Sequence, residues 1–335
     1  MSSPAPAAQT AHTTLHVVTG KGGTGKTTVA AALALALAAG GQRTLLMEVE
    51  GRQGIAQLFD TPPLPYEERR VAIALDGGEV WALAVDPGEA LLDYLEIFYN
   101  LRKAGSALRR MGAVDFATTI APGLRDVLLT GKACELVRRR DKGQPDSYDA
   151  IVLDGPPTGR ITRFLNVNAE VSGLARVGPI HNHAELVMSV IASDRTRVHL
   201  VTILEEMPVQ ETIDGVAELR AAGLPVGNLF INMARPPMLT PAQLESARDG
   251  LLPLGQIRQS ITSTLSGLDT DVIVSGLVQE ALDHARRVDL EQRERARLAQ
   301  LGLPMVDLPL LAEGIDVGAL YILAEMLRQG WTHAA

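Results

Sequence analysis

A glycine-rich segment near the start of the chain constrains its fold more than any other feature. Residues 20–28 are Gly-Lys-Gly-Gly-Thr-Gly-Lys-Thr-Thr, placed between apolar runs at 15–19 and 29–37. Strand, glycine-rich turn and helix in this order form the context of a phosphate-binding P-loop. The glycines let backbone N–H groups surround phosphates, and the N-terminus of the following helix adds partial positive charge. The sequence therefore predicts an α/β fold with a phosphate site at this turn.

The side chains of the segment have distinct predicted roles. Lys26 is placed to reach β- and γ-phosphates, and the Thr27 hydroxyl to ligate Mg²⁺. Lys21 is not needed to surround phosphates within its own chain, so we interpret it as a side chain that crosses a dimer interface to the partner's nucleotide. A solvated loop lysine is the alternative. Contacts to the nucleotide are expected from the whole loop: Gly20, Lys21, Gly22, Gly23, Thr24, Gly25, Lys26, Thr27 and Thr28.

A second part of the site is predicted at the end of another strand. Residues 150–154 are apolar until Asp154, as in parallel strands that are buried on both faces. An unpaired carboxylate there would be costly, so Asp154 is predicted to hold Mg²⁺ directly or through water, with a helix N-cap as the alternative. Gly155 begins the next turn, where a backbone N–H is suited to contact a γ-phosphate.

Several of these motifs resemble one family. Residues 20–28 resemble the deviant Walker A motif of dimerising P-loop ATPases. Residues 148–160 are Tyr-Asp-Ala-Ile-Val-Leu-Asp-Gly-Pro-Pro-Thr-Gly-Arg and, with 163–165 and 307–310, they are similar to the arsenical-pump and tail-anchored-protein-targeting branch, the anion-transporting ATPases. The resemblance implies a Mg²⁺- and ATP-dependent dimeric switch ATPase that couples ATP binding and hydrolysis to a client or partner. It runs patchily over nearly the whole chain.

The base of the nucleotide is expected near two later segments. Asn232 ends an apolar run, and an asparagine amide can pair with the amino-N7 edge of adenine, although a turn-forming asparagine is the alternative. The family resemblance also places Pro309 and Leu310 against adenine. No Asn-Lys-x-Asp guanine signature occurs in the sequence, which favours ATP over GTP.

The sequence departs from the family in both switch segments. In the first switch, Glu50 aligns with the first aspartate, and Gln57 aligns with the aspartate that positions the attacking water. A glutamine can orient water but cannot accept its proton, so hydrolysis is expected to be slow, to use Glu50, or to need a partner chain. In the second switch, Gly155 and Pro156 replace Thr-Ala, and Arg160 replaces histidine.

Two further functions are considered, and the departures in the switch segments motivate the first of them. One is a weakly active or inactive regulatory subunit that pairs with an active paralogous ATPase, so the partner is either a second copy or a paralogue. The other is a phosphotransferase for a small acid, which Lys21 and the long helical segment argue against.

Composition narrows the possible ligands and partners. A net charge of −8 argues against a general nucleic-acid binder. The single cysteine, Cys134, excludes an internal disulfide, a zinc clip within one chain and a set of thiolates for arsenite, so no metalloid stimulation is expected. His181 and His183 form a weak metal candidate without nearby ligands.

The expected architecture is a doubly wound, mainly parallel sheet of the P-loop NTPase class with an inserted helical subdomain. Residues 1–13 are Ser/Pro/Ala-rich without an apolar segment, which predicts a disordered tail and a cytoplasmic protein. Residues 14–335 then form the ATPase domain, and 87–142 form the helical insertion. A protein client is possible, and membrane contact is expected only through a client or partner.

Overall fold

The computed structural model describes residues 13–99, 122–174, 179–264 and 268–333. Its centre is an eight-stranded sheet with the strand order β3-β4-β2-β5-β1-β6-β7-β8. Every neighbouring pair is parallel except β3–β4. The strands are β1 (Leu15–Gly20), β2 (Arg43–Glu48), β3 (Arg69–Ile73), β4 (Glu79–Ala84), β5 (Ala150–Asp154), β6 (Thr196–Thr202), β7 (Val226–Ala234) and β8 (Met305–Pro309).

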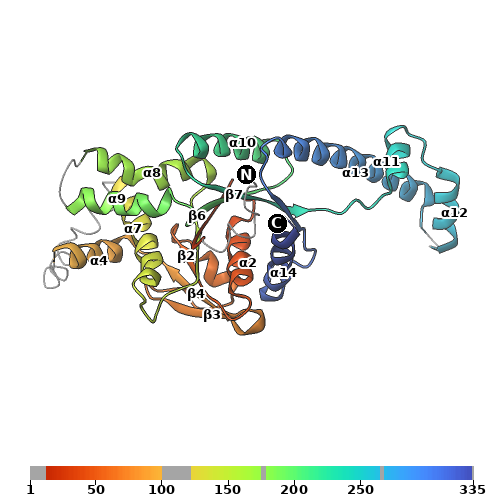
Figure 1. The fold of residues 1–335 in the computed structure, drawn as a ribbon. Helices are drawn as coiled ribbons and strands as arrows, with labels where there is room; N and C mark the ends of the chain where they lie inside the picture. The colour runs from red at the N-terminus through yellow and green to blue at the C-terminus, as the bar shows by residue number, and fades with distance from the viewer. Residues whose placement is uncertain (1–12, 100–121, 175–178, 265–267, 334–335) are drawn as a thin grey trace.

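Helices cover both faces of the sheet (Figure 1). One face packs against α2 (Lys26–Ala38), α3 (Gly54–Leu58) and α14 (Val317–His333). The other face packs against α7 (Pro122–Asp141), α8 (Thr158–Leu174), α9 (Pro179–Ile191) and α10 (Glu206–Ala221), with α4 (Pro87–Tyr99) beside α7. This arrangement is the doubly wound α/β fold of P-loop NTPases and confirms the predicted fold class.

The central strands are apolar along their whole length because both of their faces are covered. All six residues of β1 and all five of β5 are buried. Helix α2 is apolar around its circumference for the same reason, since it lies between the sheet and α14. The carboxyl ends of β1 and β5 therefore meet at one edge, with the glycine-rich loop directly after β1.

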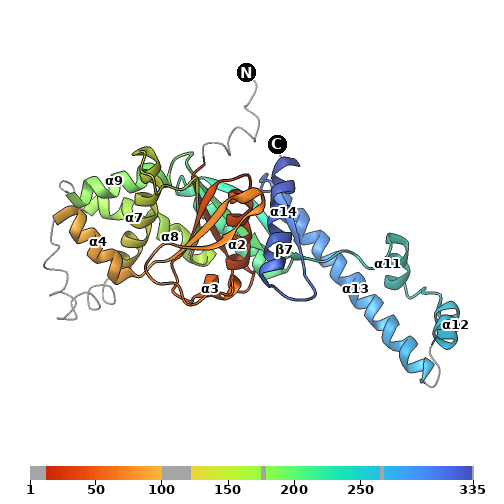
Figure 2. The same ribbon diagram turned by 90° about the horizontal axis from the view of Figure 1, so that it is seen from below.

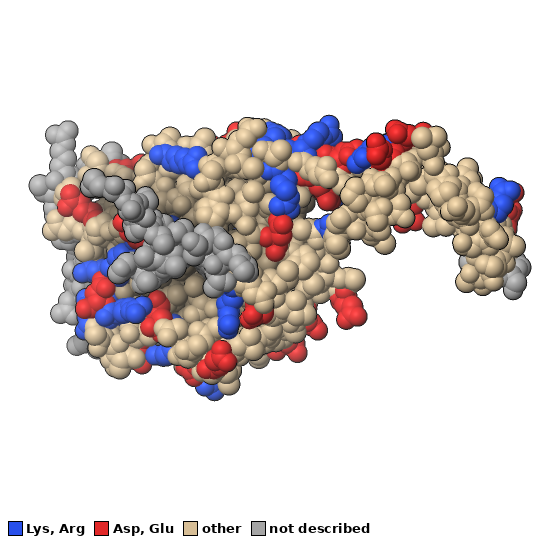
Figure 3. All heavy atoms as spheres, turned by 45° about the vertical axis from the view of Figure 1, so that its right-hand side comes forward, with Lys and Arg blue, Asp and Glu red and all other residues tan. Residues whose placement is uncertain are grey.

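Helices α11 (Pro241–Arg248), α12 (Leu254–Thr264) and α13 (Thr270–Ala299) form an arm that projects from the sheet domain (Figures 1 and 2). A small core of Leu244, Ala247, Ala285 and Val288 joins α11 to α13. On the face drawn in Figure 3, acidic and basic side chains are interspersed along the arm and the body.

The structure differs from the sequence-based expectations at several boundaries. Strand β3 was not predicted; it is an antiparallel edge strand whose side chains are mostly exposed. Thr13, which we placed in the tail, is buried, and its hydroxyl donates to the carbonyl of Asp194. Residues 1–12 and 100–121 lie outside the described residues. The described parts of 87–142 are helical until Asp141. Among the helices described, none has both the length and the apolar content to cross a membrane.

Candidate nucleotide site

The glycine-rich loop adopts a conformation that depends on its glycines. Gly23 and Gly25 have φ angles of 89° and 81°, in the left-handed region, and Gly25 is the residue before α2. A Cβ atom at Gly20 would lie 2.5 Å from the carbonyl oxygen of Val201. At Gly22 and Gly23 a Cβ would meet nothing within 4 Å, so this side of the loop faces open space. The backbone of β6 therefore packs closely against one side of the loop, and the other side is open to a ligand such as a phosphate.

Lys26, Thr27, Glu50 and Asp154 form one cluster directly after the loop. Lys26 Nζ lies 3.2 Å from Glu50 Oε2 and 3.3 Å from Asp154 Oδ1, and the Thr27 hydroxyl donates to Asp154 Oδ2 at 2.7 Å. Burial raises the pKa of the Asp154 carboxyl, and Lys26 opposes this shift. Both of its oxygens are thus occupied by a cation and a hydroxyl.

The first switch segment is anchored by a residue that we did not assign to this role. Glu48 is the last residue of β2, and its buried carboxylate accepts hydrogen bonds from the backbone N–H groups of Gln53 and Ile55. Glu48 therefore holds the start of α3. Gln57 lies on the exposed side of this short helix. The position of Glu48 at the end of a strand is visible in the sequence. The direction of its side chain is not, because it depends on the turn that follows.

Lys21 is engaged within its own chain. Its Nζ lies 2.7 Å from Glu211 Oε1 on α10, and both side chains are partly exposed. Because the two residues are far apart in sequence, no local pattern could reveal this ion pair.

The second switch segment is tied to the end of β1. The N–H of Gly155 donates to the carbonyl of Val18 at 2.9 Å, so this N–H group extends the hydrogen bonding between β5 and β1. The Thr19 hydroxyl donates to the Pro156 carbonyl at 2.7 Å. Beside this segment lies a polar cavity of about 160 Å³, lined by residues that include Glu50, Arg52, Arg125, Asp126 and Arg160.

The three residues expected near adenine lie at the neighbouring ends of β7 and β8. Asn232 is buried, and its Nδ2 donates to the Thr24 carbonyl at 2.9 Å, beneath the glycine-rich loop. The N–H of Leu310, the residue after Pro309, donates to the Ala234 carbonyl at 2.9 Å. Thus Asn232 supports the loop from below, a role that the sequence did not suggest.

The two histidines of the weak metal candidate do not converge. On α9, His181 contacts Ser172 and Glu185, whereas His183 lies against Gly131 of α7. Among the described residues, no group of three His, Cys, Asp or Glu side chains is arranged to hold a metal ion.

The parallel sheet, the glycine-rich loop after β1 and the acid at the end of β5 together define a P-loop NTPase. The model of the anion-transporting ATPase family matches residues 13–192. The chain belongs to this family, which confirms the resemblance drawn from its motifs.

Curated relatives agree with this assignment. The chain is 52% identical over 315 residues to ATPase BagA of Mycobacterium tuberculosis, covering 94% of this chain and 92% of the relative. It is 27% identical to ATPase GET3 of Kluyveromyces lactis, covering 64% and 70% of the two chains. It is also 26% identical to an arsenical pump-driving ATPase of Escherichia coli, covering 76% of this chain and 45% of the relative. The family and these names support ATPase activity in general.

Proposed function

We propose that the chain is a Mg²⁺- and ATP-dependent switch ATPase that works as a dimer. The observation that carries the proposal is the position of Lys26, whose Nζ is held between Glu50 and Asp154 beside the open side of the glycine-rich loop. These two carboxylates hold the ammonium group of Lys26 at a place from which it can move to an anion that enters the loop. ATP binding would draw Lys26 to the phosphates and release Glu50.

Asp154 and Thr27 fit the role of holding Mg²⁺. Their oxygens lie 2.7 Å apart, and carboxylate and hydroxyl oxygens are ligands that Mg²⁺ prefers. A bound Mg²⁺ would neutralise charge that develops on the phosphates. It would also give the buried Asp154 carboxylate a cation after Lys26 has moved away.

Glu50 is the proposed acceptor of the proton from the attacking water. It is the one switch I carboxylate among the described residues that lies in contact with Lys26, since Glu48 is used to hold α3. Gln57 would at most orient water. For the γ-phosphate to contact the Gly155 N–H, the bond from this group to Val18 would have to open, which would couple the second switch to the nucleotide.

Adenine is proposed to lie against Asn232, Pro309 and Leu310. The Asn232 amide nitrogen is used by Thr24, which leaves its oxygen to accept a hydrogen bond from the adenine amino group. Leu310 is 41% exposed and offers an apolar surface for the base.

Lys21 is the proposed contact between subunits. In the single chain it is docked on Glu211, and in a dimer it would exchange this carboxylate for the phosphates of the partner's nucleotide. Residues 87–142 are proposed as an insertion that could present a surface to a protein client.

A test of the proposed function is Mg²⁺-dependent phosphate release from ATP by the purified chain. Wild type is expected to release phosphate, and Lys26→Ala is expected to lose both ATP binding and release. Arg286→Ala, a surface change on α13, serves as the control and is expected to behave as wild type. Failure of the wild type to bind ATP would contradict the proposal.

The second candidate is a regulatory subunit that binds ATP but needs an active paralogue. The observation in its favour is the absence of a carboxylate at Gln57, which lies on the exposed side of α3. Tight ATP binding without turnover, followed by turnover after addition of a paralogous chain, would support it.

A further inference from the structure

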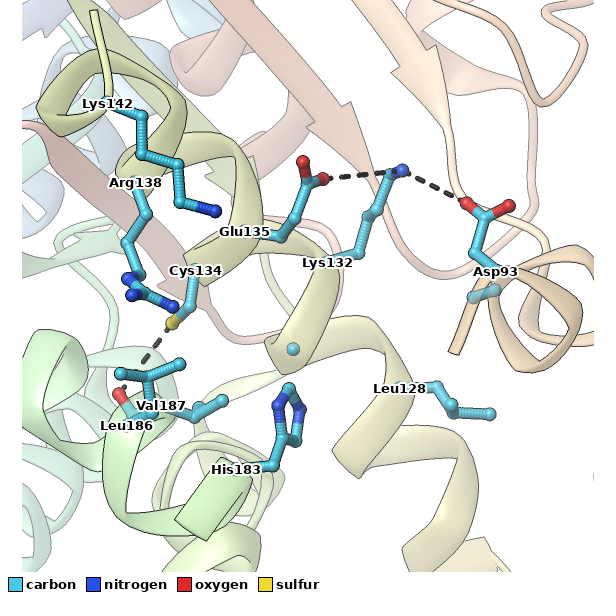
Figure 4. A pocket seen from close by; sticks show the side chains of 12 residues that line it. Asp93, Leu128, Lys132, Cys134, Glu135, Arg138, Lys142, His183, Leu186 and Val187 are labelled. Carbon is cyan, nitrogen blue, oxygen red and sulfur yellow. Dashed lines mark hydrogen bonds and ion pairs between the residues drawn. The ribbon is translucent and has the colours of Figure 1, made fainter. Parts of the chain in front are cut away.

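A cavity of about 240 Å³ lies between α4, α7 and α9, on the side of the sheet opposite α2 (Figure 4). None of its lining residues belongs to the glycine-rich loop or to either switch segment. Most of the lining is apolar and comes from Ala90, Leu128, Cys134, Leu186 and Val187. A cavity of this kind suits a ligand with an apolar body.

Two cations of the lining have no acidic partner within the part of the chain that the structure describes. Arg138 and Lys142, on α7 and directly after it, make no side-chain hydrogen bond or ion pair with any residue of the described ranges. Their neighbour Arg139 is different, because it lies 2.8 Å from both Glu68 and Glu135. Two positive charges beside an apolar cavity attract an anion.

The acids that line the cavity are already neutralised. Lys132 lies 3.1 Å from Asp93 and 3.5 Å from Glu135, as the dashed lines in Figure 4 show. Asp93 also accepts a hydrogen bond from the Tyr66 hydroxyl, and Glu135 is bound by Arg139. The lining therefore carries an excess of positive charge, which comes from Arg138 and Lys142.

His183 also lines the cavity, and it does not add to this positive charge. Its ring lies against Gly131, where a Cβ atom would come within 3.0 Å of Nε2. Burial and the nearby Arg138 lower the pKa of His183, so the ring is neutral at pH 7.

We propose that this cavity is a binding site for a small amphipathic carboxylic acid, whose apolar chain lies among Leu128, Cys134 and Val187 and whose carboxylate pairs with Arg138 and Lys142. An apolar cavity of about 150 Å³ holds benzene, so the present volume corresponds to roughly eight to ten non-hydrogen atoms. Octanoate has this size and serves as the probe. The site is independent of the proposed ATPase function because it shares no lining residue with the nucleotide site.

The test is calorimetric titration of octanoate into the full chain without nucleotide. Wild type is expected to bind one octanoate saturably. Arg138→Ala with Lys142→Ala should weaken binding about tenfold or more, because charge-assisted hydrogen bonds are the strong ones. The matched control is Arg286→Ala with Arg287→Ala, which removes the same charge from an exposed part of α13 and should leave binding unchanged. Octanamide, the neutral analogue, should bind weakly to all three proteins.

A cavity-filling variant separates this site from binding elsewhere. Ala90→Leu adds three carbon atoms to the lining and should abolish octanoate binding without lowering the thermal unfolding midpoint. Equal binding by wild type and Ala90→Leu would overturn the proposal. So would equal binding of octanoate and octanamide by the wild type, or the absence of saturable binding at millimolar octanoate.

Discussion

Asp154 is buried, which disfavours its ionised form, although the proposed binding of Mg²⁺ needs its negative charge. Its carboxylate is buried at the end of β5, and burial raises its pKa. A group whose ionised form is disfavoured in the folded chain reduces stability at neutral pH, and such strain is common at functional sites.

Asp154→Asn is expected to separate stability from activity. The amide is neutral and similar in shape, so the free energy of unfolding without nucleotide should stay within about 1 kcal/mol of wild type or rise. Mg²⁺-dependent phosphate release should fall about 100-fold or more, because an amide would hold Mg²⁺ less well and the charge that develops on the phosphates would be less stabilised. Chemical denaturation and a phosphate assay measure the two effects. A loss of stability above about 2 kcal/mol would show that the carboxylate is structural.

Glu211→Gln tests whether the ion pair with Lys21 restrains the lysine. Both side chains are partly exposed, so the change should alter the free energy of unfolding by less than about 1 kcal/mol. If Lys21 must leave Glu211 to reach a partner's nucleotide, the variant should form the ATP-bound dimer at lower protein concentration than wild type. Sedimentation with a non-hydrolysable ATP analogue measures this, and an unchanged concentration dependence would count against the proposed exchange.

Residue roles that depend on distant contacts could not be predicted from the sequence. The P-loop glycines, Lys26, Thr27 and Asp154 are recognisable because their chemistry depends on local order along the chain. The pairing of Lys21 with Glu211, and the support that Asn232 gives to Thr24, join segments that are far apart in sequence.

At the scale of elements, β1 and β6 share a buried histidine pair. His16 Nδ1 lies 3.1 Å from His199 Nε2, and the Asn228 N–H donates to His199 Nδ1. Since His199 Nδ1 is an acceptor, His199 carries its proton on Nε2 and donates it to His16. The hydrogen bond therefore requires both rings to be neutral.

The pair predicts a loss of stability in mild acid. Burial, with a smaller effect of Arg197, lowers the pKa of His16 from 6.5 to about 4, and the pKa of His199 is also lowered. Because the folded pKa lies below the unfolded one, the stability is fully present above pH 6.5 and is lost as pH falls towards 4. For His16 this amounts to roughly 3 kcal/mol. His16→Asn should make unfolding less dependent on pH in this window, as measured by urea denaturation. An unchanged slope would exclude His16 as a source of the acid sensitivity.

Periodicity predicted the elements that are buried on both faces better than those at the edges. The runs that became β1, β5 and α2 are apolar throughout because they lie between two layers. Strand β3 was missed because it pairs on one side only and its side chains are mostly exposed. The projection of α11, α12 and α13 as an arm has no signal in the periodicity of their sequence, because it depends on how α13 leaves the sheet domain (Figure 2).

At the scale of the whole molecule, the proposed ATPase requires two chains that share a nucleotide site. Each subunit would contribute Lys26, Thr27 and Asp154 to its own nucleotide and Lys21 to its partner's. The alternative, in which Lys21 acts within its own chain or only stays paired with Glu211, makes a different prediction for mixed dimers.

The most direct measurement is phosphate release by an equimolar mixture of Lys21→Ala and Asp154→Asn chains, each of which should be inactive alone. In a mixed dimer, the Lys21→Ala subunit keeps its own Asp154 and receives Lys21 from the other subunit. Half of the dimers are then mixed and each has one intact site, so activity should return to about a quarter of the wild-type value. A mixture as inactive as its components would contradict a dimeric ATPase with a shared lysine.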